Sequence, residues 1–424
     1  MRTIDNSILK GLLFGALVMG AWGIEYTSGQ STDKALSYTE YRGKVVDANT
    51  NNTLEKVQVT LNQTNIGSIT NSEGEFLLKV PEAEKAQEIR LTKVGYNQKF
   101  VRLATLGEQA TVIALIPSEE LLDQVELYQS VNPRRLVEEA LRAPAEDDRY
   151  LTGFYREGVT RGTGRNVLLA EAVVQIDQKK SMGGKHGRIE LYKSRKNTDY
   201  QVLDTTAVKL KGGPYNPLYS DVVSYPEFLF YGEGRLDNFS FHFEDPTTLN
   251  GRYVFVVYFE DNNKREPWTF GRIYVDAKTN ALLRIEYQLN VENKRQAERM
   301  LVAKKPRDFS VTPLEVSYEA NYLLTQEQSY FNYGSFFIKI RVKKKGRLFN
   351  RRFSVNSELL ITDRKDDPAF PEKELTRIRP SSIISDDIQG FGEPDFWGEN
   401  NIIEPERSLE RTFNSIWRRY QRQH

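Results

Sequence analysis

The sequence predicts a mainly β protein, in which a small seven-stranded-type β-sandwich is followed by a larger curved antiparallel sheet resembling a half-barrel, and then by a C-terminal amphipathic helix. Three observations lead to this prediction. The chain holds 22 Tyr and 22 Phe but only 4 Met, and aromatic residues favour strands. Short runs of alternating apolar and polar residues recur between turn residues. Helical periodicity is confined to short stretches.

Length and composition limit what the protein can be. A chain of 424 residues is long enough for two or three domains, and we expect boundaries at 37–117, 118–149, 150–363 and 364–424. Lys and Arg number 59 against 58 Asp and Glu, so no overall field attracts nucleic acid. The absence of cysteine excludes disulfides, thiolate nucleophiles and cysteine-held metals, as well as a lipid anchor on an N-terminal cysteine.

The first 23 residues have the pattern of a secretory signal peptide. A charged leader up to Lys10 precedes the apolar run 11–20 and the small-x-small sequence Ala21-Trp22-Gly23. Cleavage after Gly23 or as late as Gly29 fits the sequence. The alternative is an uncleaved anchor, although the apolar run is shorter than the roughly 20 residues that span a bilayer. We therefore expect an exported protein, periplasmic or associated with the outer membrane, whose mature chain has no transmembrane span.

Short strands separated by turns predict the sandwich. Val57, Val59 and Leu61 alternate with polar residues, as expected for a strand with one buried face. The stretch 69–80 predicts a hairpin closed by Asn71-Ser72-Glu73-Gly74, with Gly74 supplying a positive φ.

Four segments of this region resemble a known family. They are Gly43-Lys44-Val45-Val46-Asp47, Leu54-Glu55-Lys56-Val57, Thr70-Asn71-Ser72-Glu73-Gly74-Glu75-Phe76 and Val94-Gly95-Tyr96. They look like the carboxypeptidase-regulatory-like domain, a transthyretin-like sandwich common in exported proteins of Bacteroidetes. The resemblance covers roughly 37–117. It implies a fold and an export route rather than an activity, because the same module precedes receptors, peptidases and proteins of other roles.

Residues 47–52, Asp-Ala-Asn-Thr-Asn-Asn, place oxygen side chains at alternate positions, as a calcium loop does. However, the sixth position is Asn52 rather than Gly, and the twelfth is Gln58 rather than Glu. A turn without metal is the favoured interpretation, because Asp and Asn tolerate turn conformations.

The remainder of the chain predicts a linker helix and then a large sheet. Asn132 caps a short amphipathic helix that begins at Pro133. Strands follow at 152–157, 167–176, 188–192, 252–259, 270–276, 281–289, 314–319, 336–342 and 353–361. In the hairpin over 271–289, one face is apolar and the other polar. This hairpin is similar to those in the half-barrel fold of periplasmic lipoprotein carriers.

The sequence carries no recognisable catalytic constellation. The histidines are His186, His242 and His424, and neither internal one has the Glu spacing of a zinc carboxypeptidase. Nucleophile elbows and phosphate-binding or dinucleotide-binding glycine loops are absent. Glu171 lies in an otherwise apolar run, so it is the carboxylate of most interest, with a paired structural acid as the more ordinary interpretation. A hydrolase with an unrecognised carboxylate site remains open.

Two segments are candidate partner contacts. The first is a basic hairpin tip within 341–352, with Lys343, Lys344, Lys345 and Arg347, which could meet lipid phosphates or an acidic protein; the alternative is a solvated turn that protects a strand edge. The second is the C-terminal segment with Phe396, Trp397 and Trp417, whose helix over 408–420 either packs on the protein's own sheet or meets a partner or membrane surface.

Together these observations predict a non-catalytic binding or assembly component of the cell envelope, without cofactor or metal, that contacts an envelope or outer-membrane protein. A peripheral membrane contact is left open. The alternatives are a carrier that encloses a lipid or other apolar ligand in a half-barrel, and a hydrolase.

Overall fold

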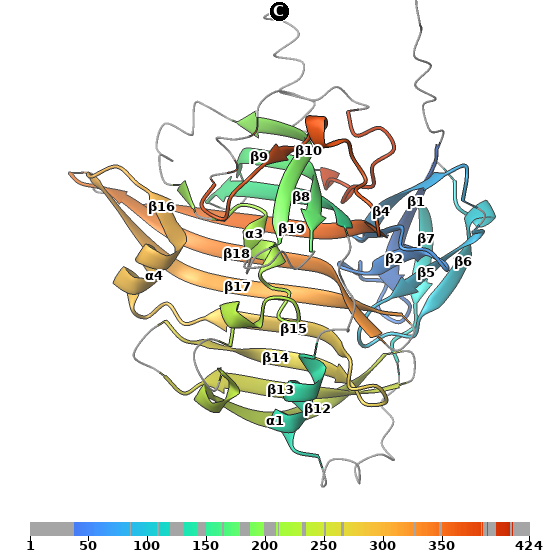
Figure 1. Ribbon diagram of the computed structural model, residues 1–424, viewed down its shortest axis with the longest axis horizontal. Coiled ribbons are helices and arrows are strands. Elements are labelled where there is room, and N and C mark those ends of the chain that lie inside the picture. Colours follow the sequence, from blue (N-terminus) through green and yellow to red (C-terminus); the bar gives the residue numbers. More distant parts are fainter. Residues whose placement is uncertain are drawn as a thin grey trace, which may run out of the picture. The chain divides into compact units, whose positions relative to one another are not determined.

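The computed structural model describes residues 38–84, 86–107, 110–118, 131–142, 150–162, 165–178, 187–198, 209–210, 212–230, 235–249, 252–263, 267–325, 328–346, 350–382, 384, 388, 396–407 and 409. The expected signal peptide and C-terminal helix lie outside these residues. Within them, strands far outnumber helices, so the mainly β prediction is confirmed (Figure 1).

The N-terminal part forms two small sheets that face each other. One has the order β4-β1-β7 and the other β3-β2-β5-β6. The strands are β1 (Tyr38–Asp47), β2 (Gln58–Leu61), β3 (Gly67–Ile69), β4 (Glu75–Pro81), β5 (Glu88–Thr92), β6 (Lys99–Arg102) and β7 (Thr111–Leu115), with a 3₁₀ turn at Leu103–Thr105. Inward-facing residues such as Val45, Val59, Phe76 and Leu91 form a continuous apolar core, as expected for a sandwich.

The predicted hairpin over 69–80 is wrong in its pairing. Gly74 does adopt a positive φ, 75°, and its N–H donates to the carbonyl of Asn71. However, β3 pairs with β2 and β4 pairs with β1, so the turn carries the chain from one sheet to the other. Because β4 is covered on both sides, Leu78 lies in the sandwich core while Leu77 packs outward in a second apolar cluster.

The larger part is one antiparallel sheet of eleven strands in the order β12-β13-β14-β15-β17-β18-β19-β8-β9-β10-β20. The strands are β8 (Tyr150–Arg161), β9 (Arg165–Asp177), β10 (Arg188–Thr198), β12 (Phe239–Leu249), β13 (Arg252–Asp261), β14 (Thr269–Asp276), β15 (Leu282–Leu289), β17 (Phe309–Thr325), β18 (Gln328–Lys344), β19 (Arg351–Lys365) and β20 (Thr376–Arg377). A separate pair joins β11 (Lys209–Leu210) to β16 (Val302–Lys304). The sheet does not close on itself.

Helices cover one face of this sheet. They are α1 (Pro133–Ala140), α3 (Tyr215–Leu218) and α4 (Lys294–Leu301), with 3₁₀ turns at Pro226–Phe228 and Arg235–Asn238; a further 3₁₀ turn lies at Glu372–Glu374. Asn132 accepts a hydrogen bond from the N–H of Arg135, which is the predicted cap of α1. Leu136 and Val137 pack into the same core as Val257 and Ile285. The helix-covered face is therefore the apolar one.

The sandwich and residues 396–407 contact the opposite, more polar face. Trp397, Ile402 and Ile403 form an apolar cluster with Ile69 and Leu77 of the sandwich and with Phe154, Val173, Tyr333 and Leu360 of the sheet. The amide of Asn401 accepts from the N–H of Lys79 at 2.7 Å and donates to its carbonyl at 3.0 Å. This segment thereby joins the sandwich to the large sheet.

Candidate functional site: a cationic pocket beside a polar row

A row of polar side chains crosses the face of the sheet that contacts the sandwich. Each member is directly opposite the next in strand register, and directly opposed residues project from the same face. From β12 to β10 the row reads His242, Tyr258, Arg272, Glu286, Glu319, Ser335, Glu358, Arg156, Glu171 and Arg195. Strands that are remote in sequence thus contribute to a single charged stripe.

At one end of the row the charges neutralise one another. Glu171 is fully buried and accepts hydrogen bonds from Arg156 Nε at 2.8 Å and from Arg195 Nε at 2.7 Å. Arg156 also donates to the carbonyl of Ile403. Burial by itself would raise the pKa of Glu171, but the two guanidinium groups hold that pKa below its usual value. Glu171, the carboxylate of most interest in the sequence, is therefore placed as a paired structural acid.

In the middle of the row, the sandwich supplies the counter-charge. Lys56 Nζ lies 2.5 Å from Glu319 Oε2, and Arg284 lies 3.4 Å from the other carboxylate oxygen. Burial alone would raise the pKa of Glu319, but the charges of Lys56 and Arg284 lower it. Close by, Gln58 donates to the carbonyl of Tyr322. Two hollows lie next to these contacts, and Lys56 and Glu319 line both of them.

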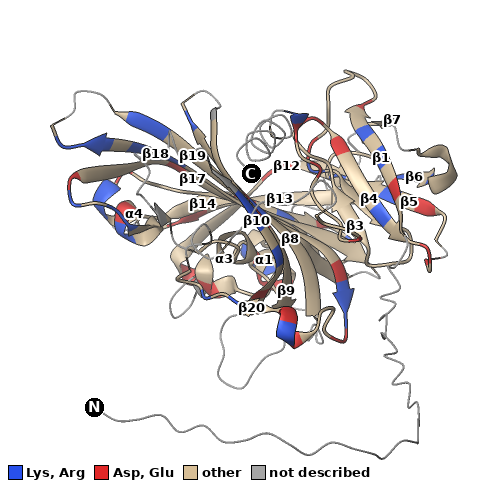
Figure 2. Cartoon of the chain, turned by 90° about the horizontal axis from the view of Figure 1, so that it is seen from above, with Lys and Arg blue, Asp and Glu red and all other residues tan. Residues whose placement is uncertain are grey.

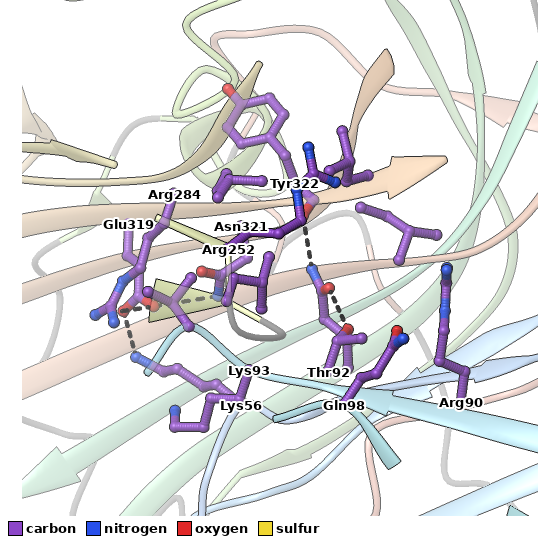
Figure 3. A pocket seen from close by; sticks show the side chains of 16 residues that line it. Lys56, Arg90, Thr92, Lys93, Gln98, Arg252, Arg284, Glu319, Asn321 and Tyr322 are labelled. Atoms are coloured by element: carbon purple, nitrogen blue, oxygen red, sulfur yellow. Dashed lines mark hydrogen bonds and ion pairs between the residues drawn. The ribbon is translucent and has the colours of Figure 1, made fainter. Parts of the chain in front are cut away.

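The first hollow, here called the cationic pocket, lies between β5 of the sandwich and the ends of β13, β15 and β17, with a volume of about 330 Å³. Its lining includes five cations and one carboxylate: Lys56, Arg90, Lys93, Arg252, Arg284 and Glu319. Figure 3 shows Arg90 extending from β5 at one side of the pocket and Lys56 reaching Glu319 of the sheet. The lining has a strong excess of positive charge.

Two of these cations have no carboxylate bound to them within the described part of the chain. Arg90 makes no ion pair or side-chain hydrogen bond there, and burial lowers its pKa. Lys93 donates to the backbone carbonyl of Glu55 at 2.8 Å. Burial, together with the positive charge of Arg284, lowers the pKa of Lys93 to about 8. A lowered pKa in a cation means that its surroundings disfavour its charge, and an anionic ligand would relieve this.

The other pocket cations are already engaged. Arg252 pairs with Asp276, and Arg284 pairs with Glu286 at 2.7 Å. The Nε atoms of both arginines are nevertheless buried without a hydrogen-bond acceptor among the described residues. These side chains therefore shape the positive wall of the pocket and retain unused donors.

The second hollow, here called the acidic groove, has the opposite charge balance and a volume of about 670 Å³. Five carboxylates and two cations line it: Glu55, Glu286, Glu319, Glu358, Glu406, Lys56 and Arg272. Burial raises the pKa of Glu358, and the nearby carboxylate of Glu406 adds to this effect. Tyr333 donates a hydrogen bond to Glu358 at 2.7 Å. The groove thus holds one carboxylate with a lowered pKa, Glu319, and one with a raised pKa, Glu358.

The Asp47 loop is a turn held by its own backbone. Asp47 Oδ1 accepts from the N–H groups of Asn49 and Thr50, and Oδ2 accepts from the hydroxyl of Tyr96 at 2.8 Å. The hydrogen bond from Thr50 is the main reason why the pKa of Asp47 is lowered. Among the residues that the structure describes, no group of three His, Cys, Asp or Glu side chains is arranged to hold a metal ion. In the same residues, no helix has the length and hydropathy of a membrane span.

The aromatic residues proposed as partner contacts lie between the two parts of the molecule. Trp397 is only 4% exposed, and its ring stands edge-on to Phe154 with centroids 5.3 Å apart. Arg195 lies over the same ring at 5.0 Å. Phe396 is half-buried against Trp397. Both side chains serve an internal contact in this structure, while Trp417 lies outside the described residues.

The basic residues proposed as partner contacts lie at the surface. Lys343 and Lys345 are exposed, and Lys344 is half-exposed. Lys344 Nζ is 3.5 Å from Asp308. Gly346 takes a φ of 82° between β18 and β19, which agrees with the predicted hairpin tip. Arg347, His186 and His424 lie outside the described residues.

The sequence analysis did not single out the residues of the cationic pocket. Arg90 alternates with the buried Ile89 and Leu91 on β5, so the pattern assigns it to the outer face of a sandwich strand. On that face a cation is most often solvated. Arg90 and Lys93 differ from ordinary surface cations because the large sheet covers them. The covering residues are about 160 to 230 positions away in the sequence, so no local pattern reveals them.

Comparison with solved structures finds several distant likenesses. A domain named for outer-membrane lipoprotein sorting, from Vibrio parahaemolyticus, is 12% identical, with 57% of this chain and 95% of that chain covered and a TM-score of 0.24. A LolA superfamily protein from Nitrosomonas europaea is 9% identical, with coverage of 58% and 98% and a TM-score of 0.23. The complex of MucA and MucB from Pseudomonas aeruginosa gives 11% identity, coverage of 56% and 100%, and a TM-score of 0.18. Likeness at this level is too distant to transfer a ligand or a partner.

No curated protein sequence gives a significant match to the chain. A family model does match its N-terminal part. Residues 41–127 match the family described as CarboxypepD_reg-like domain. The resemblance inferred from the four segments between Gly43 and Tyr96 is therefore confirmed for this domain.

Proposed function

We propose that the protein is a non-catalytic binding component of the cell envelope, and that it holds a small anionic ligand in the cationic pocket. The single observation behind this proposal is that Arg90 and Lys93 face the pocket with no carboxylate bound to them among the described residues. The signal-like sequence at residues 1–23 and the match to an export-associated domain support an envelope location.

The pocket has the properties of a ligand site rather than of a packing defect. It combines apolar walls from Leu249, Leu283 and Leu324 with cationic side chains, and a volume of about 330 Å³ suits a small molecule. A ligand with carboxylate or phosphate groups would supply the missing negative charge and accept hydrogen bonds from the guanidinium of Arg90. Its binding would also join the sandwich to the large sheet, because both contribute cations.

Citrate is a suitable probe, because its carboxylates stay ionised at and above neutral pH. We expect calorimetric titration of the full chain at pH 7 to detect binding. The double variant Arg90→Met/Lys93→Met should weaken it by at least 10-fold. The matched control is Arg102→Met/Lys373→Met, which removes two exposed cations elsewhere and should bind citrate as the wild type does.

The pH dependence provides a second readout. Because the pKa of Lys93 is about 8, its charge is largely lost between pH 7 and 9, and citrate affinity should fall over this interval in the wild type. In Lys93→Met that fall should disappear. Equal affinity in wild type and pocket variant at pH 7 would refute the assignment of this pocket.

The envelope role is tested separately. Crosslinking in cells followed by purification of the full chain should recover an envelope protein in a defined complex. Recovery of the protein as a free monomer, without crosslinked envelope partners, would count against the role in the envelope while leaving the citrate result unaffected.

A hydrolase is the second candidate, and the acidic groove favours it. Glu319 and Glu358 are both directly opposite Ser335, one on each neighbouring strand, so their backbones are about 10 Å apart. One carboxylate with a lowered pKa and one with a raised pKa is the arrangement that glycoside hydrolysis uses. Activity towards chromogenic glycosides that Glu358→Gln or Glu319→Gln reduces by about 100-fold or more would establish it; activity unchanged by both variants would dismiss it.

A carrier of apolar ligands receives less support from these features. The two hollows described here are lined by charged side chains, and the apolar face of the sheet packs against α1, α3 and α4. Lipid chains prefer a cavity with apolar walls.

A further inference from the structure

Basic side chains from three separate segments meet at one end of the large sheet. We call this surface the basic tip. It comprises α4, the connection from β16 to β17, and the described residues at the adjoining ends of β18 and β19. Its exposed cations are Lys294, Arg295, Arg299, Lys304, Lys305, Arg307, Lys343, Lys345 and Arg352. In Figure 2, blue segments gather on α4 and on the neighbouring ends of the strands.

Strand register brings these segments together. Phe309, the first residue of β17, is opposite Lys344, the last of β18, and Arg341 is opposite Arg352 across β18 and β19. On the helix side, Ala297 and Leu301 of α4 pack in one apolar cluster with the ends of the same strands. The cations therefore lie at one end of the sheet, those of α4 on its apolar face and Lys343 and Arg352 on the other, although they span almost sixty positions of sequence.

Few carboxylates balance this charge. Glu298 pairs with Lys305, and Asp308 lies 3.5 Å from Lys344. Seven exposed cations have no carboxylate partner among the described residues: Lys294, Arg295, Lys304, Arg307, Lys343, Lys345 and Arg352. The whole chain has a formal net charge of only +1. The basic tip is thus a local excess of positive charge on a protein that is otherwise close to neutral.

Protection of a sheet edge does not account for all of this excess. Lysines at strand ends often prevent an edge strand from pairing with another molecule. At this end of the sheet β18 is paired on both sides, with β17 and with β19, whereas residues 309–316 of β17 pair with β18 only. Edge protection could therefore apply to residues beside the start of β17, but it does not explain the cations of β18 and of helix α4.

We propose that the basic tip docks on the surface of an anionic lipid bilayer. A bilayer presents a plane of negative headgroups without fixed geometry, which suits long, flexible, exposed cations better than a shaped pocket does. Met300 on α4 is 50% exposed among these cations, so an apolar side chain is available to enter the headgroup layer. The inference is independent of the ligand of the cationic pocket.

The test uses the full chain and vesicles sedimented with bound protein. We expect binding to vesicles of phosphatidylcholine with about one-third phosphatidylglycerol, and weak binding to phosphatidylcholine by itself. Binding should weaken steeply as salt is raised, because added ions screen exposed charges. The variant Lys343→Gln/Lys345→Gln/Arg352→Gln removes three cations, each worth about fivefold, and should weaken binding by roughly 100-fold.

Two further variants complete the test. Arg102→Gln/Lys373→Gln/Arg379→Gln removes three exposed cations elsewhere and should retain wild-type binding, whereas Lys294→Gln/Arg295→Gln on α4 should weaken binding by roughly 25-fold. Equal binding to neutral and anionic vesicles would overturn the proposal. So would equal losses in the tip and control variants, wild-type binding by the α4 variant, or capture of an acidic protein without vesicle binding.

Discussion

The buried cluster around Glu171 and the cationic pocket differ in whether their positive charges are neutralised. In the cluster, two arginines enclose one carboxylate and every charge is close to its opposite: Arg156 is 3% exposed and Glu171 0%. In the pocket, Arg90 and Lys93 face a hollow without a bound carboxylate among the described residues. The difference teaches that buried charge which is neutralised within the chain stabilises the fold, whereas buried charge without an opposite charge leaves a surplus that a ligand of opposite sign can neutralise.

The largest effect should come from breaking the neutralised cluster. Glu171→Gln leaves two arginines beneath the sandwich and the 396–407 segment without their carboxylate, and we expect a loss of about 3–5 kcal/mol in the free energy of unfolding. Urea unfolding measures it. As a control, Arg156→Met/Glu171→Leu/Arg195→Met removes the carboxylate together with both of its arginines and should cost less than the single change. A loss of under 1 kcal/mol for Glu171→Gln would contradict the structural role of the cluster.

Removing Lys56 should have an intermediate effect on stability, because its ion pair with Glu319 is partly buried. Lys56→Met should cost about 1–2 kcal/mol, since Glu319 keeps Arg284 as a partner. Lys56 has a φ of 56°. Methionine is chosen as the replacement because it tolerates this positive φ about as well as lysine does, so the change tests the charge and not the backbone. Lys56→Arg, which keeps the charge, is the comparison, and equal unfolding midpoints for the Met and Arg variants would show that the pair contributes nothing.

Lys93 should behave in the opposite way. Removing an uncompensated cation, as in Lys93→Met, should leave stability at pH 7 within about 0.5 kcal/mol of wild type or raise it. The folded protein releases the Lys93 proton near pH 8, whereas the unfolded chain holds it to about 10.4. The unfolded state thus binds more protons in between, so wild-type stability should rise relative to Lys93→Met as pH increases from 8 to 10. Parallel stability curves for the two proteins would contradict the lowered pKa.

Replacing Glu358 should have the smallest effect on the free energy of unfolding. It extends the comparison to a buried carboxylate to which no cation is bound among the described residues. Its pKa is raised in the folded protein, so the folded state binds more protons than the unfolded chain above about pH 4.3. The contribution of Glu358 to stability is therefore present at lower pH and lost as pH rises through the folded pKa. Glu358→Gln should be within about 0.5 kcal/mol of wild type at pH 7. Chemical unfolding at pH 4 and pH 7 should show a smaller difference between the two pH values for the variant.

Much of the secondary structure could be predicted locally. The β-branched and aromatic run 252–259 and the alternation along 270–276 and 281–289 predict strands, and Asn132 and Pro133 predict the start of a helix, because these patterns depend on neighbouring residues. The turn at Asn71–Gly74 is predictable for the same reason. The pairing of its two strands is not predictable in this way, because a turn does not reveal whether the chain returns to the same sheet or crosses to the facing one.

The sequence by itself determined the fold class, the regulatory-like domain and the absence of cysteine chemistry, all of which follow from local pattern and composition. Only the tertiary structure decided which charges are neutralised. Arg156 and Glu171 meet across two strands, Lys56 meets Glu319 across 263 positions, and Arg90 meets no carboxylate among the described residues. Strand register and the docking of the sandwich set these distances, and Coulomb interactions depend on distance in space and on burial rather than on separation along the chain.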